Sequence, residues 1–196
     1  MKVGVLAVQG SFAEHAHVLK GLVEEVRLVR RADELRDISA LVIPGGESTT
    51  IGGFIGKQDF TAAIGKDLPV FGTCAGLIAL AKKIEGRHKE GQGLLKRMDI
   101  LVERNAYGRQ RESFEDEIRL TWDKKPFRGV FIRAPKIIRY SPDVKVLAWH
   151  EKDPVLVQQG SDLACAFHPE LTDDVRIHKY FIEKVAENVR TRRIHK

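Results

Sequence analysis

The sequence predicts an α/β fold, doubly wound, in which a mostly parallel central sheet with antiparallel additions carries helices on both faces. Two observations along the chain predict it. The first half alternates short apolar runs with helical patterns, which is typical of a parallel sheet covered by helices. The second half holds short strand-like runs separated by turn residues and charges, which indicates antiparallel strands. With 196 residues, of which 43% are hydrophobic, the chain has the length of one globular domain, and we expect a single domain over residues 1–196.

The first half begins with an apolar strand, expected at residues 2–8. A helix over residues 11–22 follows, because Ser11 is a candidate N-cap and Glu14 stands three residues later. Further strands are expected at 26–29, 41–43 and 68–71. The strand at 41–43 stops at Pro44, which two glycines follow. The last of these strands leads into a helix over residues 75–83, because apolar residues recur there at helical spacing.

The second half predicts strands at residues 100–103, 117–121, 130–133, 144–149, 155–158 and 163–167. An amphipathic helix is expected over residues 177–189. The charged segment 82–96 contains three glycines and few large apolar residues, which predicts an exposed loop. No internal repeat or low-complexity linker divides the chain.

The composition argues against several classes of function. The net charge is +6, but the basic residues are scattered beside acids, and the concentrated basic tail at 190–196 is typical of a solvated end. We therefore expect no nucleic-acid partner. Two cysteines are too few for a disulfide framework, and no apolar run is long enough to span a bilayer. The expectation is a cytoplasmic protein that binds no membrane, no metal and no cofactor.

Three unusual turns follow strands of the predicted sheet. They are Gly45-Gly46-Glu47-Ser48, Thr73-Cys74-Ala75-Gly76 and His168-Pro169-Glu170. In open parallel sheets, ligands bind at the carboxyl ends of the strands. Distant segments of the chain are therefore expected to meet in one crevice, which is stronger evidence for a site than any of these turns alone.

Cys74 lies where a buried strand meets a helix, between closely spaced glycines. A residue at such a corner is held in a strained conformation with its side chain exposed above the sheet. Its sulfur faces the positive end of the following helix, which activates a thiol. Cys74 is therefore a candidate nucleophile. The alternative is a small cysteine packed against the sheet, which is the common role of free cysteines.

A thiol nucleophile needs a base, and His168 has the right chemistry because imidazole titrates near neutrality. Pro169 favours an extended backbone at His168, and residues two apart in an extended chain point to the same side. Glu170 is then placed to hold one imidazole nitrogen while the other faces Cys74, in a triad arrangement. The alternative is a buried histidine and a first-turn helix acid without a catalytic role.

The remaining candidates are weaker. Backbone amides of the turn at residues 44–48, together with the amide of Ala75, are candidate donors to a tetrahedral oxyanion. The same turn is also compatible with a simple cap, by Ser48 or Thr49, of a helix through residues 51–54. Cys165 is expected in the core, a zinc site with His168 is excluded for want of a second ligand pair, and His178 is expected to pack. His15 and His17 belong to no pattern.

Taken together, the motifs identify the chain as resembling the class I (triad) glutamine amidotransferases. More narrowly, it is similar to the glutaminase subunits of pyridoxal 5′-phosphate synthase. The residues that carry this resemblance are 8–10, 44–50, 72–76, 102–110, 113–115, 131–135 and 167–174. They are spread over nearly the full length, and their combination in this order is highly specific.

The resemblance implies the chemistry of the site. Cys74 attacks the side-chain amide of L-glutamine, His168 protonates the departing ammonia and then activates water, and Glu170 orients His168. The residues implied to hold glutamine are Gly46, Glu47, Ser48, Arg104, Ile132 and Arg133. The ends of glutamine are a carboxylate and an ammonium, which arginine and glutamate complement, although the residues leave open which charge meets which end.

The resemblance also implies a partner. Ammonia passes to the (β/α)8-barrel synthase subunit (PdxS), which forms a dodecameric core decorated by glutaminase subunits. The glutaminase is weak until it docks, and a peptide flip at Gly45-Gly46 is a candidate switch. One departure is the segment 51–67, which is shorter and richer in glycine than is usual for the family. Two alternatives stay open: a triad glutaminase with another acceptor, and a catalytically silent binding subunit.

Overall fold

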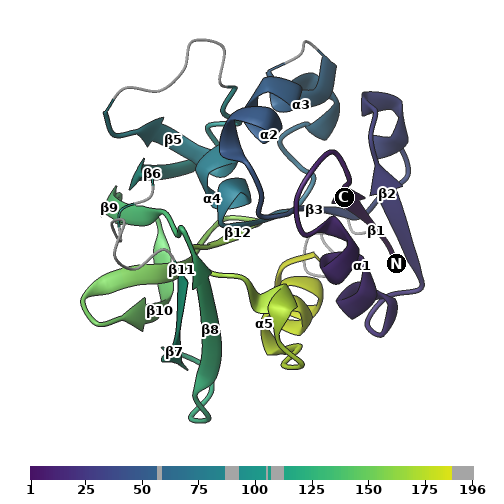
Figure 1. Cartoon of the computed structure of the whole chain (residues 1–196). Coiled ribbons are helices and arrows are strands. Elements are labelled where there is room, and N and C mark those ends of the chain that lie inside the picture. Colours follow the sequence, from purple (N-terminus) through teal and green to yellow (C-terminus); the bar gives the residue numbers. More distant parts are fainter. Residues whose placement is uncertain (57–58, 87–92, 105, 107–112, 187–196) are drawn as a thin grey trace.

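The computed structural model describes residues 1–196 except 57–58, 87–92, 105, 107–112 and 187–196. A nine-stranded sheet runs through the molecule in the order β2-β1-β3-β4-β12-β11-β10-β7-β8 (Figure 1). A three-stranded sheet, β5-β6-β9, lies beside it. The predicted fold class is confirmed.

The parallel half of the large sheet is built from β2, β1, β3, β4 and β12. These strands span Lys2–Leu6 (β1), Glu25–Val29 (β2), Ala40–Ile43 (β3), Val70–Thr73 (β4) and Asp162–Cys165 (β12). Apart from β2 they are almost completely buried, which explains why they read as continuous apolar runs.

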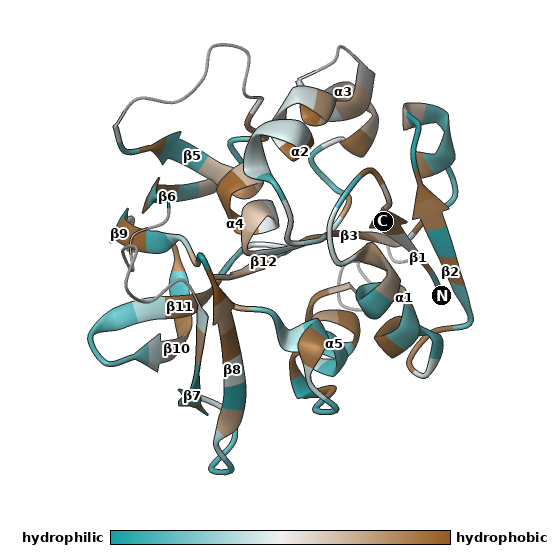
Figure 2. Ribbon diagram, viewed as in Figure 1, coloured by the Kyte–Doolittle hydropathy of each residue, from teal (hydrophilic) through white to brown (hydrophobic). Residues whose placement is uncertain are grey.

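Helices cover both faces of this half (Figure 1). Helices α1 (Phe12–Lys20) and α5 (Arg176–Tyr180) lie on one side. Helices α2 (Ser48–Ile55), α3 (Asp59–Ile64) and α4 (Ala75–Leu80) lie on the other. Figure 2 shows hydrophobic and hydrophilic residues side by side on α1 and α5, as expected for helices with one face on a sheet. No helix within the described ranges is long and apolar enough to cross a membrane.

The antiparallel half continues the sheet from β12 through β11, β10, β7 and β8. Its strands are β7 (Ser113–Leu120), β8 (Phe127–Ile132), β10 (Lys145–His150) and β11 (Asp153–Gln159). The small sheet consists of β5 (Ala81–Ile84), β6 (Met98–Glu103) and β9 (Lys136–Tyr140). Strands β5 and β6 pair in parallel, and β6 and β9 pair antiparallel.

Several expected boundaries were wrong. The helix expected over 75–83 ends at Leu80, and Ala81 turns to an extended backbone that opens β5. The sequence Ala-Lys-Lys-Ile contains no residue that stops a helix. The pairing of β5 with β6 therefore determines that these residues form a strand. The first part of the loop expected at 82–96 is therefore strand, and residues 87–92 of it lie outside the described ranges.

Some elements were not anticipated. They are the 3₁₀ turn η1 (Ala32–Leu35), helix α3 and strand β9. The C-terminal helix expected at 177–189 is α5 followed by a π-helical segment, Phe181–Ala186. Its last residues and the basic tail at 190–196 lie outside the described residues.

Candidate active site

Cys74 occupies the corner between β4 and α4 with a φ angle of +49°. This left-handed conformation is unusual for a residue with a side chain and is the strain expected of a nucleophile elbow. The Cys74 amide donates to the carbonyl of Cys165 at the end of β12, 2.8 Å away. The Cys74 side chain is 7% exposed and its sulfur lies 3.8 Å from the carbonyl oxygen of Ile132. The strand-to-helix corner predicted from the sequence is confirmed, but the expected exposure of the side chain was wrong, because the end of β8 packs against the sulfur.

His168 follows β12, the strand that pairs in parallel with β4, so it lies beside Cys74 at the same edge of the sheet. Its amide donates to the carbonyl of Val130 on β8, 2.8 Å away. Burial by itself lowers the pKa of His168, but hydrogen bonds to Cys74 and Glu170, together with the charges of both residues, raise that pKa to about 10. An imidazole held in this way carries a proton at neutral pH, as a general acid must.

Glu170 binds His168 as expected, although not through an extended backbone. Residues Pro169–Leu171 form a 3₁₀ turn with His168 as its N-cap. The turn brings Oε1 of Glu170 to 2.7 Å from Nδ1 of His168. Burial raises the pKa of Glu170, but the neighbouring His15 and the contacts with His168 and Ser11 outweigh it and lower that pKa to about 2. The carboxylate is therefore ionised, and Nε2 of His168 is left to face Cys74.

The turn after β3 packs directly on this histidine. A Cβ atom on Gly45 would lie 2.3 Å from Cε1 of His168, so only glycine fits at this position. The Gly45 amide donates to the Thr73 hydroxyl at 3.0 Å, and the Glu47 amide donates to Oε1 of Gln9 at 2.6 Å. Both amides were candidate oxyanion donors, and in this conformation both are used inside the protein.

Glu47 caps helix α2, where Ser48 or Thr49 was expected to do so. Its carboxylate accepts from the Thr50 amide at 2.9 Å and from the Thr49 hydroxyl. The Thr49 hydroxyl contributes most to lowering the pKa of Glu47 to about 2. Glu47 has a longer side chain than serine, so from one position earlier it reaches the same Thr50 amide that Ser48 was expected to reach. Glu47 stays exposed and ionised at the mouth of the site, with Gly46 exposed and Ser48 half-buried beside it.

The other predicted glutamine contacts lie on two neighbouring strand ends. Ile132 ends β8 and its carbonyl contacts the Cys74 sulfur, and the exposed Arg133 follows with a φ of +44°. Arg104 follows β6, whose last residue Glu103 pairs with Lys136 at the start of β9, three residues after Arg133. Of the motif that follows Arg104, residues 105 and 107–112, including Gly108-Arg109-Gln110, lie outside the described residues.

Three residues in contact with the site were not predicted from the sequence. They are Ser11, His15 and His178. Thr73 belongs to one of the three turns expected at the site, and His15 also contacts its hydroxyl. Ser11 had been assigned only as an N-cap, but its hydroxyl donates to Oε1 of Glu170 at 2.5 Å. His15 and His178 are fully buried beside that carboxylate. The available signal was the spacing of Ser11 and His15, which places both on one face of a helix.

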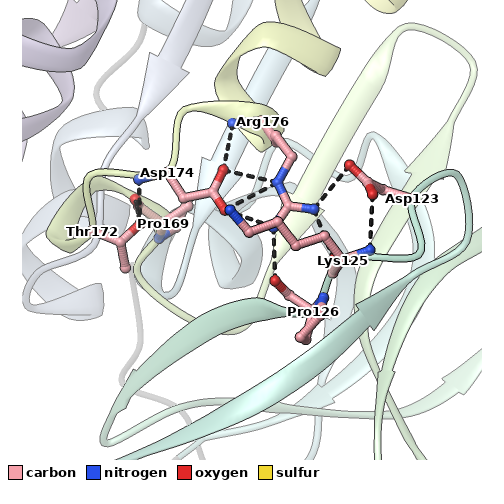
Figure 3. A network of polar contacts seen from close by, with 7 residues as sticks. All are labelled: Asp123, Lys125, Pro126, Pro169, Thr172, Asp174 and Arg176. Atoms are coloured by element: carbon pink, nitrogen blue, oxygen red, sulfur yellow. Dashed lines mark hydrogen bonds and ion pairs between the residues drawn. The ribbon is translucent and has the colours of Figure 1, made fainter.

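The segment that leads away from the triad is fixed to the β7–β8 turn by a polar network (Figure 3). The Thr172 hydroxyl donates to the carbonyl of Pro169 at 3.1 Å and accepts from the amide of Asp174 at 3.3 Å. Arg176 pairs with Asp174 and Asp123, and also donates to the carbonyls of Lys125 and Pro126, just before β8. His168 and Glu170 therefore sit on a segment held at both of its ends.

The second cysteine serves a different purpose. Cys165 is completely buried in β12, as expected, and its thiol donates to the carbonyl of Phe167 at 3.2 Å. Burial raises the pKa of Cys165 well above the usual value, so its thiol stays neutral.

Within the part of the chain that the structure describes, no group of His, Cys, Asp and Glu residues is arranged to hold a metal ion.

Comparison with known proteins places this geometry in a family. The SNO glutamine amidotransferase family model matches residues 5–187. Curated relatives carry the name pyridoxal 5′-phosphate synthase subunit PdxT. That of Thermotoga petrophila is 50% identical over 190 residues, covering 94% of this chain and 100% of the relative. That of Pelotomaculum thermopropionicum is 54% identical over 189 residues, covering 94% and 95%.

Solved structures agree with the family model. A structure described as a glutamine amidotransferase superposes with a TM-score of 0.87 at 46% identity, covering 94% of this chain and 98% of its own. A Thermoplasma acidophilum protein at 17% identity shares the fold, with a TM-score of 0.69. A matching sequence, a matching fold and a cysteine at a strained strand-to-helix corner beside a histidine–glutamate pair lead to one conclusion: this chain belongs to the SNO glutamine amidotransferase family.

Proposed function

We propose that this chain is the glutaminase subunit of a pyridoxal 5′-phosphate synthase and hydrolyses L-glutamine to L-glutamate and ammonia. The observation that supports this most is the meeting of Cys74, His168 and Glu170 at the carboxyl ends of the adjacent strands β4 and β12. Family membership and the names of the relatives agree with it. Because this chemistry serves vitamin B6 biosynthesis, the chain supplies nitrogen to cofactor synthesis.

The proposed reaction proceeds through a thioester. The sulfur of Cys74 attacks as a thiolate, paired with the protonated His168, and bonds to the side-chain carbonyl carbon of glutamine, forming a tetrahedral oxyanion. His168 gives its proton to the amide nitrogen, the C–N bond breaks and ammonia leaves. The now neutral His168 takes a proton from water, whose oxygen attacks the thioester carbonyl. The C–S bond breaks, glutamate leaves, and the thiolate of Cys74 and the imidazolium of His168 are restored.

We propose that the glutamine contacts come from residues at three strand ends. Gly46, Glu47 and Ser48 follow β3, and Arg104 follows β6. Ile132 and Arg133 lie at the end of β8, where the Ile132 carbonyl contacts the Cys74 sulfur. The ionised Glu47 suits the α-ammonium of glutamine, and a guanidinium suits its α-carboxylate.

The turn after β3 is the proposed point of control. The amides of Gly45 and Glu47 donate to Thr73 and Gln9, so neither is available to an oxyanion in this conformation. A rotation of the Gly45–Gly46 peptide when the synthase docks changes which backbone groups face Cys74, and glycine permits such a rotation at little cost. Weak activity of the free protein and strong activity of the docked protein follow from this proposal.

The proposed partner is the (β/α)8-barrel synthase subunit, PdxS, assembled as a dodecameric core. Ammonia released into water becomes ammonium, which is not a nucleophile, so a direct path between the two subunits protects it. Within this assembly we propose that residues 1–196 act as one cytoplasmic glutaminase domain.

The test is glutamate release from L-glutamine, measured with and without the synthase subunit. We expect strong stimulation by the synthase and loss of turnover in Cys74→Ala, because the nucleophile is gone. Cys165→Ala is the matched control, since it removes a buried thiol that takes no part in the reaction. Turnover in Cys74→Ala would contradict the triad. Equal activity with and without the synthase would remove the partner, and no activity in either case would favour a silent binding subunit.

A further inference from the structure

The triad carboxylate has a second buried histidine beside it. Nε2 of His15, on α1, lies 3.3 Å from Oε2 of Glu170, the carboxylate oxygen that does not bind His168. Nδ1 of His15 lies 2.9 Å from Nε2 of His178 on α5. Oε2 of Glu170 is buried and has no hydrogen-bond partner among the described residues. We propose that His15 is a positioning residue of the triad, whose Nε2–H stabilises this oxygen electrostatically, and that His178 fixes the tautomer of His15. The proposal rests on the function proposed above.

The tautomers follow from the hydrogen bonds. Nδ1 of His178 is buried and has no hydrogen-bond partner among the described residues. An unpartnered buried N–H costs more than an unpartnered lone pair. His178 therefore carries its proton on Nε2 and donates it to Nδ1 of His15. His15 in turn carries its proton on Nε2, which hydrogen-bonds the Thr73 hydroxyl at 3.0 Å and lies 3.3 Å from Oε2 of Glu170.

The opposite assignment places one repulsive contact and one unpartnered donor in the core. If His15 donated from Nδ1 to His178, the lone pair on Nε2 of His15 would lie beside an ionised carboxylate oxygen. His178 would then bury an N–H with no acceptor among the described residues. In the favoured assignment His178 donates to His15, and the Nε2–H of His15 lies between the Thr73 hydroxyl and the carboxylate that binds His168.

Both added histidines act as neutral groups. Burial lowers the pKa of His15, which Glu170 offsets only in part. Burial and the neighbouring His15 lower the pKa of His178 to about 3. The other charged groups that act on His15 are His168 and, on its own helix, Glu14. A neutral donor steadies a carboxylate without adding a charge that would compete with the imidazolium of His168.

Thr73 connects the same histidine to the turn that packs on His168. Nε2 of His15 lies 3.0 Å from the Thr73 hydroxyl oxygen, which accepts the Gly45 amide at 3.0 Å. Thr73 directly precedes the nucleophile, and Gly45 touches the ring of His168. Ser11, one turn before His15 on α1, binds the other oxygen of Glu170. Helix α1 therefore orients the triad carboxylate through both of its oxygens.

A purely structural role for His15 makes different predictions from a positioning role. If His15 only fills space, any side chain that packs equally well will preserve activity. If its Nε2–H orients Glu170, the position of the donor matters. Glutamine places an amide nitrogen near the position of Nε2 in histidine, and asparagine places one near Nδ1. His15→Gln and His15→Asn therefore differ in where the donor lies, and His15→Leu removes it.

The experiment measures kcat and KM for glutamine in the complex with the synthase, for wild type and these three variants. We expect kcat to fall about 10- to 100-fold in His15→Leu, the range expected when a polar contact to a buried charged group is lost. We expect His15→Asn to resemble His15→Leu and His15→Gln to recover most of the activity. KM is expected to stay unchanged, because His15 contacts none of the proposed glutamine-binding residues. His17→Gln, at an exposed position on the same helix, is the matched control.

A second readout does not depend on turnover. The rate of Cys74 alkylation by iodoacetamide is followed against pH in the free protein. Loss of the donor loosens the Glu170–His168 pair, so the pH profile of His15→Leu is expected to shift relative to wild type, while that of His15→Gln does not. Circular dichroism and thermal melting check that each variant is folded. If His15→Leu does not fold, the comparison of Gln with Asn decides.

Wild-type kcat and an unshifted alkylation profile in His15→Leu would overturn the proposal. Equal loss in His15→Gln and His15→Asn would also overturn it and would leave His15 as a packing residue. Failure of the proposed function is a separate outcome, since wild type itself would then lack glutaminase activity, or Cys74→Ala would retain it.

Discussion

At the residue scale, the candidate triad could be predicted from local sequence, whereas the residues that contact it from α1 and α5 could not. The glycines around Cys74 mark it as a candidate nucleophile. His168 and Glu170 are only two residues apart, so their pairing could also be predicted from local sequence. His15 meets His178 across 163 positions and Ser11 meets Glu170 across 159. Nothing in a single sequence marks two segments that far apart as neighbours. The sequence also could not predict the backbone conformation that brings Glu170 to His168, because Pro169 permits both an extended chain and a 3₁₀ turn.

The charge on the triad pair makes stability depend on pH in two directions. The pKa of Glu170 is lowered to about 2 in the folded protein, so its stabilisation is present above its unfolded value near 4.5 and is lost as pH falls towards 2. The pKa of His168 is raised to about 10, so its stabilisation is present below its unfolded value of 6.5 and is lost as pH rises towards 10. The pair therefore stabilises the fold most between about pH 4.5 and 6.5.

We expect Glu170→Gln to lower the free energy of unfolding most within that window. The difference from wild type is expected to shrink as the pH is raised from 6.5 towards 10, because the His168 partner loses its proton there. Urea unfolding at a series of pH values measures it. Glu117→Gln is the control, since Glu117 is an exposed acid on β7. A constant difference between wild type and Glu170→Gln at every pH would contradict the charge pairing.

At the element scale, periodicity identified the buried strands correctly and misjudged elements that tertiary pairing determines. The strands β1, β3, β4 and β12 are hydrophobic throughout, so their sequence leaves little choice. Strand β5 begins within a helical pattern and exists because β6 offers it backbone partners. Helix α3 lies in the glycine-rich segment 51–67, which was noted as unusual but not recognised as helical. Glycine content alone does not decide whether a segment forms a helix.

Two glycines in helices of the α2–α4 layer illustrate the point and are expected to respond oppositely to alanine. A Cβ on Gly53 of α2 meets no atom within 4 Å, so Gly53→Ala is expected to stabilise the fold by about 0.5–1 kcal/mol through reduced backbone entropy in the unfolded chain. A Cβ on Gly76 of α4 would lie 2.1 Å from the carbonyl oxygen of Ile43, and Gly76→Ala is expected to destabilise by about 1–3 kcal/mol.

Chemical denaturation of the two variants beside wild type measures both effects. Because alanine has the same helix propensity at either position, the difference between the variants isolates the close approach of α4 to β3. Equal stability changes in Gly53→Ala and Gly76→Ala would show that backbone contact at Gly76 does not limit this packing.

At the scale of the whole molecule, the parallel half of the large sheet and the small sheet meet at one largely buried ion pair. Arg97, just before β6, binds both carboxylate oxygens of Asp162 at the start of β12, at 2.8 and 2.9 Å. It also donates to the carbonyl of Leu68 at 2.8 Å, and Asp162 accepts the amide of Val70 at 3.1 Å. The pair therefore ties the small sheet to the two strands that carry Cys74 and His168 at their far ends.

Replacing one partner of this ion pair is expected to lower the free energy of unfolding far more than replacing both partners. Arg97→Leu leaves the Asp162 carboxylate, whose side chain is 7% exposed, without its cation, and about 3–5 kcal/mol of stability is expected to be lost. Burial already raises the pKa of Asp162 despite Arg97, and without Arg97 that rise is unopposed. A raised carboxyl pKa means that stability is lost as pH increases, so the variant is expected to be weaker at pH 8 than at pH 5 relative to wild type.

The double variant Arg97→Leu with Asp162→Asn provides the decisive comparison. Asparagine keeps an acceptor for the Val70 amide but buries no charge, so the double variant is expected to be more stable than Arg97→Leu alone and to lose its pH dependence. Urea unfolding of the single and double variants at both pH values measures this. A double variant no more stable than Arg97→Leu would mean that the carbonyl contacts of Arg97, and not the charge of Asp162, hold the sheets together at this point.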